Sequence, residues 1–245
     1  MTIVEHLEEL RYRVLICLLA LLAGGVAAWQ AVPHVLGALA SVAGRLIVTS
    51  PAEAFLGYLK ILVVLDLTLA APVLVAQAWL YVVPGLYPHE IRLVTRAAPA
   101  AGLLFGAGIA FGYLVVYPVA LRFLLGQAGP GVVPALALSR YLSFLVSVTL
   151  PFGVIFEMPL ASYLLARLGM LTGAALRRGR RWAILAAFTA GALLTPTVDA
   201  VTQSLMAGPI VLLYELSIHT ATWAGRRRRQ WDESDNGTLE SRSHA

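Results

Sequence analysis

Long apolar stretches dominate the chain, and three acidic residues lie inside them: Asp66, Glu157 and Glu215. Hydrophobic residues make up 59% of the 245 residues and charged residues only 13%. This composition is too apolar for a soluble domain, so an all-α integral membrane protein is predicted. A charge at the centre of a spanning helix costs about 2.5–3.5 kcal/mol on insertion scales. Each acid is therefore expected either to face another helix or to serve a function.

Six stretches of about 20 mainly apolar residues are candidate membrane spans. They cover residues 14–32, 61–83, 97–121, 141–166, 182–194 and 200–223. The fifth is short, because only 14 residues separate Arg181 from Pro196. As a helix this segment is about 21 Å long, against a hydrocarbon core of about 30 Å. Either this span is re-entrant or the bilayer thins around it.

The distribution of basic residues predicts that both termini are cytoplasmic. With the N-terminus inside, 14 of the 18 lysines and arginines lie in inside segments. The four on the outside are Arg45, Lys60, Arg122 and Arg140. This bias requires an even number of spans and favours a full crossing by the short fifth segment. The charged, acidic start does not resemble a cleavable signal peptide, so the first span is expected to remain in the membrane.

Local signals divide the chain further. Ser50, Pro51 and Glu53 form a helix start with a capping box, and the pattern runs unbroken into the second span. Residues 2–14 form an amphipathic segment that is expected to lie at the membrane surface before the chain turns inward. The region 1–224 is predicted to be a single transmembrane domain. The basic and then polar tail, residues 225–245, is predicted to be disordered.

Helix breakers and small residues predict how the middle spans pack. Pro151, Gly153 and Pro159 predict a bent fourth span, which would make one side of the molecule concave. Two pairs of glycines in the third span have helix-packing spacing, and contact within the molecule explains them better than dimerisation does. They are Gly102 with Gly106 and Gly108 with Gly112.

Five sequence segments resemble the signature segments of the TatC family, the receptor subunits of the twin-arginine protein translocase. They are EHLEELRYR, TSPAEAFLGYLK, VVPGLYPHE, FGVIFEMP and LLTPTVDAVTQ. The resemblance covers about residues 5–223, in order and with a matching number of spans. It implies a cup of six helices, the last two short, in a prokaryotic cytoplasmic membrane. One departure is Val198, where the family pattern has a proline before the aspartate.

The resemblance also implies a function and partners. Such a subunit binds twin-arginine signal peptides of folded precursors at the cytoplasmic face. With single-span TatA/TatB-type subunits it supports export driven by the proton-motive force. A hetero-oligomer in contact with membrane lipid is expected, with no cofactor, no metal and no nucleic acid.

Glu9 and Glu90 match the positions at which the family contacts the twin arginines, and Arg11 matches a further family position. A carboxylate can accept both donors of a guanidinium fork, whereas lysine offers only a point charge. Purely structural roles stay open for both acids. Glu9 could form an ordinary helical pair with Arg13, and Glu90 could be a first-turn acid that the helix dipole favours.

Glu157 lies near the middle of the fourth span, about 15 Å from Arg167 along the helix. One interpretation places it on the concave face, where it contacts the cargo signal or a partner helix. The alternative is a buried acid that a neighbouring hydroxyl or amide satisfies. Thr195 and Gln203 match a polar patch that the family uses to hold a partner's transmembrane helix, although capping of the Pro196 turn would also account for them.

The chain lacks the sequence motifs of the common enzyme classes. It contains no P-loop, no HExxH and no GxSxG motif, and its single cysteine, Cys17, is expected to pack within the first span. A non-enzymatic subunit is therefore predicted. The alternative is a proton-coupled small-solute transporter, since membrane acids and broken helices also mark those proteins. That class predicts inverted repeats, which the two halves of this chain do not show.

Overall fold

The structure is a computed structural model of a nearly all-helical chain. It describes the backbone of residues 3–43, 46–48, 50–82, 88–127, 136–194 and 199–243. Within these ranges it also describes the side chains, except those of residues 3–6, 40–43, 82, 88–91 and 227–243. In chain order the elements are α1 (Ile3–Ala43), β1 (Leu46–Ile47), α2 (Pro51–Val82), α3 (Pro88–Phe111), the π-helix η1 (Gly112–Val116), α4 (Tyr117–Gly126), β2 (Leu136–Ala137), α5 (Leu138–Ile155), α6 (Met158–Arg167), α7 (Gly173–Leu194) and α8 (Ala200–Ser243).

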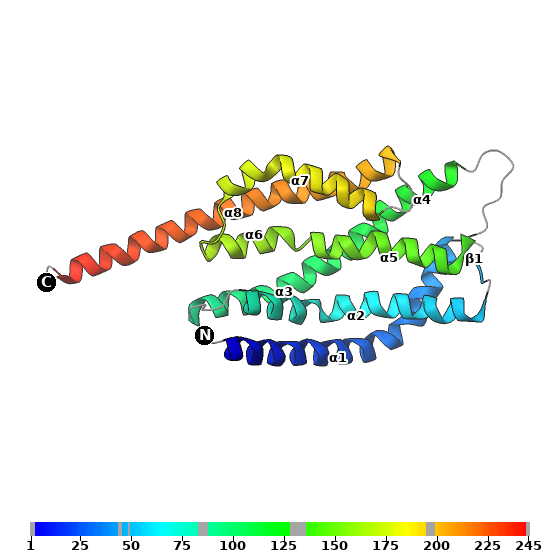
Figure 1. The fold of residues 1–245 in the computed structure, drawn as a ribbon, viewed down its shortest axis with the longest axis horizontal. Helices are drawn as coiled ribbons and strands as arrows, with labels where there is room; N and C mark the ends of the chain where they lie inside the picture. Colours follow the sequence, from blue (N-terminus) through cyan, green and yellow to red (C-terminus); the bar gives the residue numbers. More distant parts are fainter. Residues whose placement is uncertain are drawn as a thin grey trace.

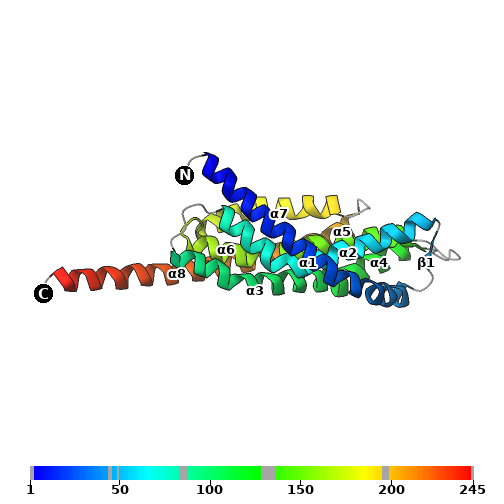
Figure 2. The ribbon, with the colours of Figure 1, turned by 90° about the horizontal axis from the view of Figure 1, so that it is seen from below.

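The helices run back and forth along one long axis (Figures 1 and 2). The segments α3, η1 and α4 form one continuous pass, and α5 and α6 form another. We call the end where α1, α3 and α7 begin the basic end, because α7 carries four arginines in its first nine residues. The opposite end, where β1 pairs with β2, is the clip end. Both chain termini point toward the basic end (Figure 1).

Five helical segments in the described part of the chain are long and apolar enough to cross a membrane. They are Leu7–Leu39, Pro51–Tyr81, Arg92–Gly126, Leu138–Arg167 and Ala200–Arg226. The short fifth span predicted from the sequence corresponds to α7, which lies alongside α8. With α7 as the fifth pass and α8 as the last, the described chain makes six helical passes. The composition of α7 differs from the others because the arginines occupy its first half. The predicted six-pass, all-helical architecture is thus confirmed, whereas a cup-shaped opening stays a prediction.

The first and last helices differ from the sequence prediction. The segment 2–14 was expected to lie on the membrane surface, but α1 is one helix from Ile3 to Ala43 with Pro33 inside it. No turn separates this segment from the apolar run, because strong helix formers continue without a break. Its location at the membrane surface stays a prediction. The backbone of α8 is likewise helical to Ser243, where composition predicted a disordered tail. The domain boundary near residue 224 stays a prediction.

Glycines allow α3 and η1 to approach α5 closely. A Cβ on Gly108 would lie 2.3 Å from the carbonyl oxygen of Phe152, and one on Gly112 would lie 2.8 Å from the Cα of Thr149. Gly102 faces Pro72 of α2 in the same way, at 2.3 Å. The glycine pairs therefore serve contacts within the molecule, as the sequence predicted.

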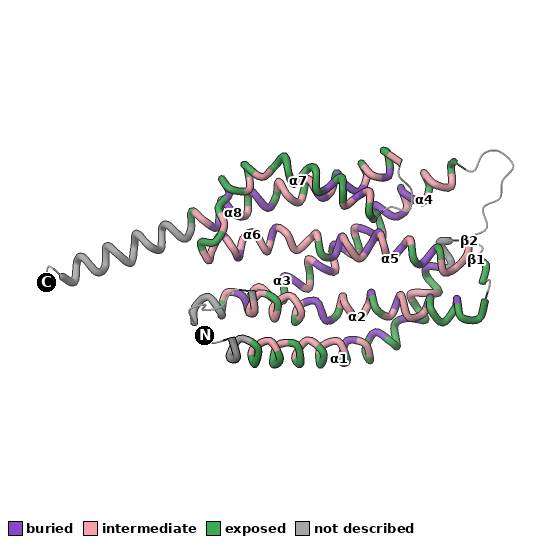
Figure 3. The backbone as a smooth tube through the Cα atoms, in the orientation of Figure 1, coloured by how far each residue is buried: buried purple, intermediate pink, exposed green. Residues whose placement is uncertain are grey.

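Buried residues concentrate toward the clip end (Figure 3). The main cluster combines Val32 of α1, Ile61 of α2 and Leu142 of α5 with residues of α4, α7 and α8. Toward the basic end the structure describes only a small cluster of Ala166, Ala221 and Ala224, with two partly buried neighbours. Packing therefore holds the clip half together most firmly.

Polar contacts join α2 to α5 at the clip end. Glu53, expected to complete a capping box, accepts a hydrogen bond of 2.6 Å from the backbone N–H of Ser139. Lys60 Nζ donates to the hydroxyl of Ser143 at 2.6 Å and to Ser139. The parallel pairing of Leu46 with Leu136 adds a third connection. The start of α5 is thus fixed by side chains of α2.

Candidate functional site

Glu9 lies near the start of α1 and binds a guanidinium. Both Nε and Nη2 of Arg13 donate to its Oε1, the former at 3.1 Å. Nη1 of Arg13 also donates to Oε1 of Gln77 in α2, at 3.2 Å. The helical pair that the sequence left open is therefore present, and it is tied to the neighbouring helix. Both contacts with Glu9 use the same carboxylate oxygen.

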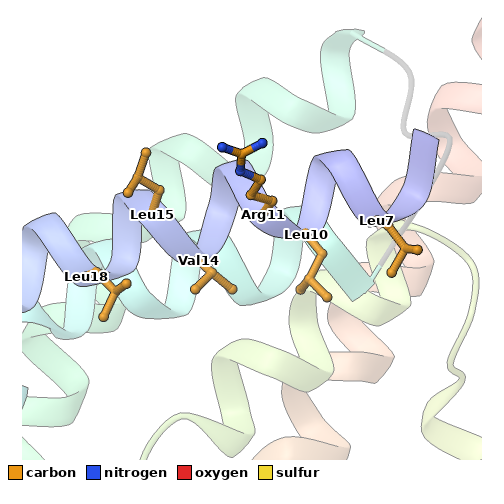
Figure 4. Close-up of a pocket in the computed structure, with 6 residues that line it drawn as sticks. All are labelled: Leu7, Leu10, Arg11, Val14, Leu15 and Leu18. Carbon is orange, nitrogen blue, oxygen red and sulfur yellow. The ribbon is translucent and has the colours of Figure 1, made fainter. Parts of the chain in front are cut away.

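Arg11 lies on a different side of α1. Two residues along an α-helix correspond to a rotation of about 200°, so Arg11 does not share the face of Glu9. It is exposed and lies in a shallow groove whose other lining residues are apolar (Figure 4). These are Leu7, Leu10, Val14, Leu15 and Leu18. The structure therefore does not bring Arg11 together with Glu9.

Glu90 lies in the first turn of α3, which begins at Pro88. Its side chain lies outside the described residues. Since α1 and α3 both begin at the basic end, the backbone positions of Glu9 and Glu90 lie at the same end of the bundle (Figures 1 and 2).

Glu157 lies at the break between α5 and α6. Its N–H donates to Val154 at 3.1 Å rather than continuing the α-helical pattern, and Pro159 follows directly in α6. The helix is thus interrupted at Phe156 and Glu157, within the segment where the sequence predicts a bend. The Oε1 atom of Glu157 is buried, and it has no hydrogen-bond partner among the described residues. A neighbouring hydroxyl or amide therefore does not satisfy this oxygen in the described part of the chain.

Gln203 connects the last two helices. Its Nε2 donates to the carbonyl oxygen of Phe188 in α7 at 2.9 Å, and Gly191 packs against its backbone. Asp199 caps α8 by accepting the N–H of Thr202 at 2.7 Å. Thr195 lies outside the described residues, so its partnership with Gln203 stays a prediction.

The structure also shows the contacts of Glu215 and Asp66, which the sequence did not predict. Glu215 pairs with Arg180 of α7, with Oε2 and Nη2 separated by 2.6 Å. The arginine-rich start of α7 could have signalled this partner, because the last two spans form an antiparallel pair. Asp66 lies against α1, where a Cβ on Gly24 would be 2.5 Å from its Oδ1. That oxygen is buried without a hydrogen-bond partner among the described residues.

These features define a class of protein: a multi-pass helical membrane protein with a guanidinium-binding acid at one end and an acid at a break inside the bundle. In the described part of the chain, no three His, Cys, Asp or Glu side chains are grouped to hold a metal ion. The family model described as Sec-independent protein translocase protein (TatC) matches residues 5–209. The chain belongs to the TatC family and is a subunit of the Sec-independent, twin-arginine translocase.

Similar proteins cover nearly the whole chain. The Sec-independent protein translocase protein TatC of Carboxydothermus hydrogenoformans is 37% identical, over 90% of this chain and 93% of the relative. The protein of the same name in Escherichia coli (strain K12) is 34% identical, over 98% and 95%. A solved structure titled Crystal Structure of Twin Arginine Translocase Receptor-TatC is 37% identical, with a TM-score of 0.76 over 89% of this chain and 99% of that chain. The chain is therefore a multi-pass inner-membrane protein and a transport component, and the small-solute transporter interpretation is set aside.

Proposed function

We propose that the chain binds twin-arginine signal peptides at the cytoplasmic face, with Glu9 and Glu90 as the acids that accept the two guanidinium groups. The observation that carries this proposal is the contact between Glu9 and Arg13, in which two N–H donors reach one carboxylate oxygen. A guanidinium therefore already fits this site sterically and electrostatically. Charge-assisted hydrogen bonds of this kind are about twice as strong as neutral ones.

The arrangement of Arg13 suggests how an incoming arginine is accepted. Arg13 uses Oε1 of Glu9 and also donates to Gln77 of α2. A peptide arginine can bind the remaining oxygen, or it can displace Arg13, which keeps its contact with Gln77. A lysine cannot form the paired contact, because its ammonium is a point charge. Discrimination between arginine and lysine follows from this geometry.

The face of the membrane at which binding occurs follows from charge. The 14 to 4 distribution of basic residues supports cytoplasmic termini, and the even number of helical passes in the described chain is consistent with it. The start of α1 and the start of α3 would then both face the cytoplasm, where precursors arrive. Arg11, on the other side of α1, would act near this site without sharing the carboxylate of Glu9.

Two further sites belong to the proposal. Glu157, with an oxygen that lacks a partner among the described residues, would contact the signal peptide or a partner helix during export. Gln203 and Thr195 would hold the transmembrane helix of a single-span TatA/TatB-type subunit, since interhelical hydrogen bonds in lipid contribute about 0.6–2 kcal/mol each. Energy would come from the proton-motive force.

A comparison of cross-linking yields between variants tests the receptor site. A twin-arginine signal peptide with a photoreactive group is bound to the chain in membrane vesicles, and the yield is compared for Glu9→Gln and Glu8→Gln. Glu8 is the neighbouring exposed acid, so its variant controls for lost charge. We expect Glu9→Gln to reduce the yield about tenfold, the factor that corresponds to about 1.4 kcal/mol, and Glu8→Gln to leave it unchanged. Equal yields in both variants would contradict the proposal.

A further inference from the structure

The ion pair between Arg180 and Glu215 joins two helices whose mutual position matters for the partner site. Nη2 of Arg180 lies 2.6 Å from Oε2 of Glu215, and the side chains are 50% and 32% exposed. Each residue therefore has a contact that it could not obtain from its own helix. In lipid, contact between apolar helix surfaces contributes little free energy, because the lipid tails are equally apolar. Specific polar contacts therefore determine how helices align.

A second contact lies directly beside this pair. The hydroxyl of Tyr214 donates to the carbonyl oxygen of Leu176 at 2.7 Å. Leu176 lies one helical turn before Arg180, and Tyr214 adjoins Glu215. Two donor–acceptor contacts one turn apart fix both the height and the rotation of α7 along α8. The two helices also approach each other closely near this point. A Cβ on Gly173 of α7 would lie 2.1 Å from Oγ1 of Thr222 in α8.

The helix α8 is held independently of α7. Ser162 of α6 donates to the carbonyl oxygen of Ser217 at 3.1 Å, and Thr220 donates to that of Pro159 at 3.0 Å. Among the described elements, α7 makes extensive contact only with α8. The height of α7 in the membrane is therefore set by α8, whereas α8 is fixed by α6.

α7 is short for a membrane span. Its apolar part, residues 182–194, is about 20 Å long as a helix, which is shorter than a hydrocarbon core of about 30 Å. Hydrophobic mismatch favours sliding or tilting of such a helix. At the other end of the pair, Gln203 contacts Phe188 of α7, so a slip of α7 would remove the contact that orients this amide.

We propose that Arg180 and Glu215 are positioning residues: their ion pair sets the register of α7 on α8 and thereby keeps Gln203 in place for a partner helix. This inference rests on the proposed function of Gln203. The pair gives a role to an acid whose purpose the sequence did not reveal. It acts through geometry and does not itself touch the partner.

The register is measured by double electron–electron resonance. Nitroxide labels are attached at Leu193→Cys and Leu212→Cys, two exposed positions on α7 and α8, in a Cys17→Ala background. We expect Arg180→Glu and Glu215→Arg to shift or broaden the distance by up to about 5 Å, one helical turn. The double variant, which reverses the charges, should restore the original distance. Arg178→Glu is the matched control, since Arg178 is exposed on the same helix.

Unchanged distances in both single variants, or a double variant that fails to restore the distance, would overturn the inference. If charge reversal prevents folding, Glu215→Gln removes the charge and keeps the side-chain shape, and its distribution should still broaden. A cysteine at Leu193 or Val201 is then scanned for disulfides with a coproduced single-span subunit. In the Arg180 and Glu215 variants, we expect the cysteine at position 193 to form disulfides with different positions of the single-span subunit. The cysteine at position 201 should keep its original disulfide partners. If the unaltered chain forms no such disulfide, the partner site fails, whereas the distance measurement still decides the register.

Discussion

Glu9 and the three acids within the apolar stretches differ in their partners. Glu9 and Glu215 each bind an arginine, on their own helix and on the neighbouring helix respectively. Glu157 and Asp66 each keep a buried oxygen without a hydrogen-bond partner in the described part of the chain. An unsatisfied buried polar atom costs about 1–3 kcal/mol. A purely structural role does not explain why a destabilising acid occupies this position. The unsatisfied oxygen is therefore consistent with a functional role for Glu157.

Replacement of Glu157 by glutamine tests that role. The amide keeps the size of the side chain and cannot carry a negative charge. We expect the variant to fold with an unchanged melting temperature and to export a twin-arginine precursor about tenfold more slowly, the rate equivalent of about 1.4 kcal/mol. Export is measured in inside-out membrane vesicles. Export at the unaltered rate by a folded variant would show that the acid is structural.

At the scale of the helices, close crossings depend on single missing side chains. Gly108 lies against the backbone of α5, where Phe152 also packs edge-on against Phe111, with ring centroids 5.5 Å apart. If Gly108 carried a side chain, these backbone atoms could not rotate away from it, as the end of a flexible side chain could. The sequence predicted a helix contact from the glycine spacing, but not which helix would be the partner, because spacing carries no information on the opposite surface.

Gly108→Ala is expected to destabilise the chain by about 1–3 kcal/mol, the usual cost of overpacking. The reason is that the added methyl group would meet the carbonyl oxygen of Phe152 at 2.3 Å. Gly37→Ala is the control, since no described atom lies within 4 Å of its Cβ position. Thermal unfolding in detergent compares the two. Equal melting temperatures would show that α3 and α5 can separate without cost.

A carboxylate of α2 holds the start of α5 at the clip end. Glu53 is 6% exposed and accepts the N–H of Ser139 at the start of α5, where Ala137 offers no side-chain cap. We expect Glu53→Ala to cost about 1–3 kcal/mol, because a helix N-terminal donor loses its acceptor. The more exposed Glu8 serves as control when changed to Ala. Unfolding measurements that show no difference would remove this role.

At the scale of the whole molecule, the sequence predicted the number of passes, the break before Pro159 and an unbroken helix from Pro51 into the second span. These features follow from local chemistry: apolar length, missing backbone donors and an N-terminal cap. It did not predict the ion pair of Glu215 or the contact of Asp66 with α1. Those depend on which helix faces come together, and this is decided by packing. Of the site residue Glu90 the structure describes only the backbone, and Thr195 lies outside the described residues.

The orientation of the molecule can be tested by labelling from each side. In a Cys17→Ala background, Val48→Cys and Arg226→Cys place single exposed cysteines near opposite ends of the bundle. We expect an impermeant maleimide to label position 48 in intact cells, and position 226 only after the membrane is opened. The opposite pattern would place the termini outside and contradict the charge rule.

The most direct test of receptor function is binding of a twin-arginine signal peptide to the purified chain, compared with a twin-lysine version of the same peptide. The proposed acceptor geometry requires two guanidinium forks and two carboxylates. We predict that the twin-lysine peptide and the variants Glu9→Gln and Glu90→Gln each lose at least about tenfold in affinity, or about 1.4 kcal/mol. Equal affinity for both peptides, unaffected by either variant, would contradict the assignment of these acids as the receptor site.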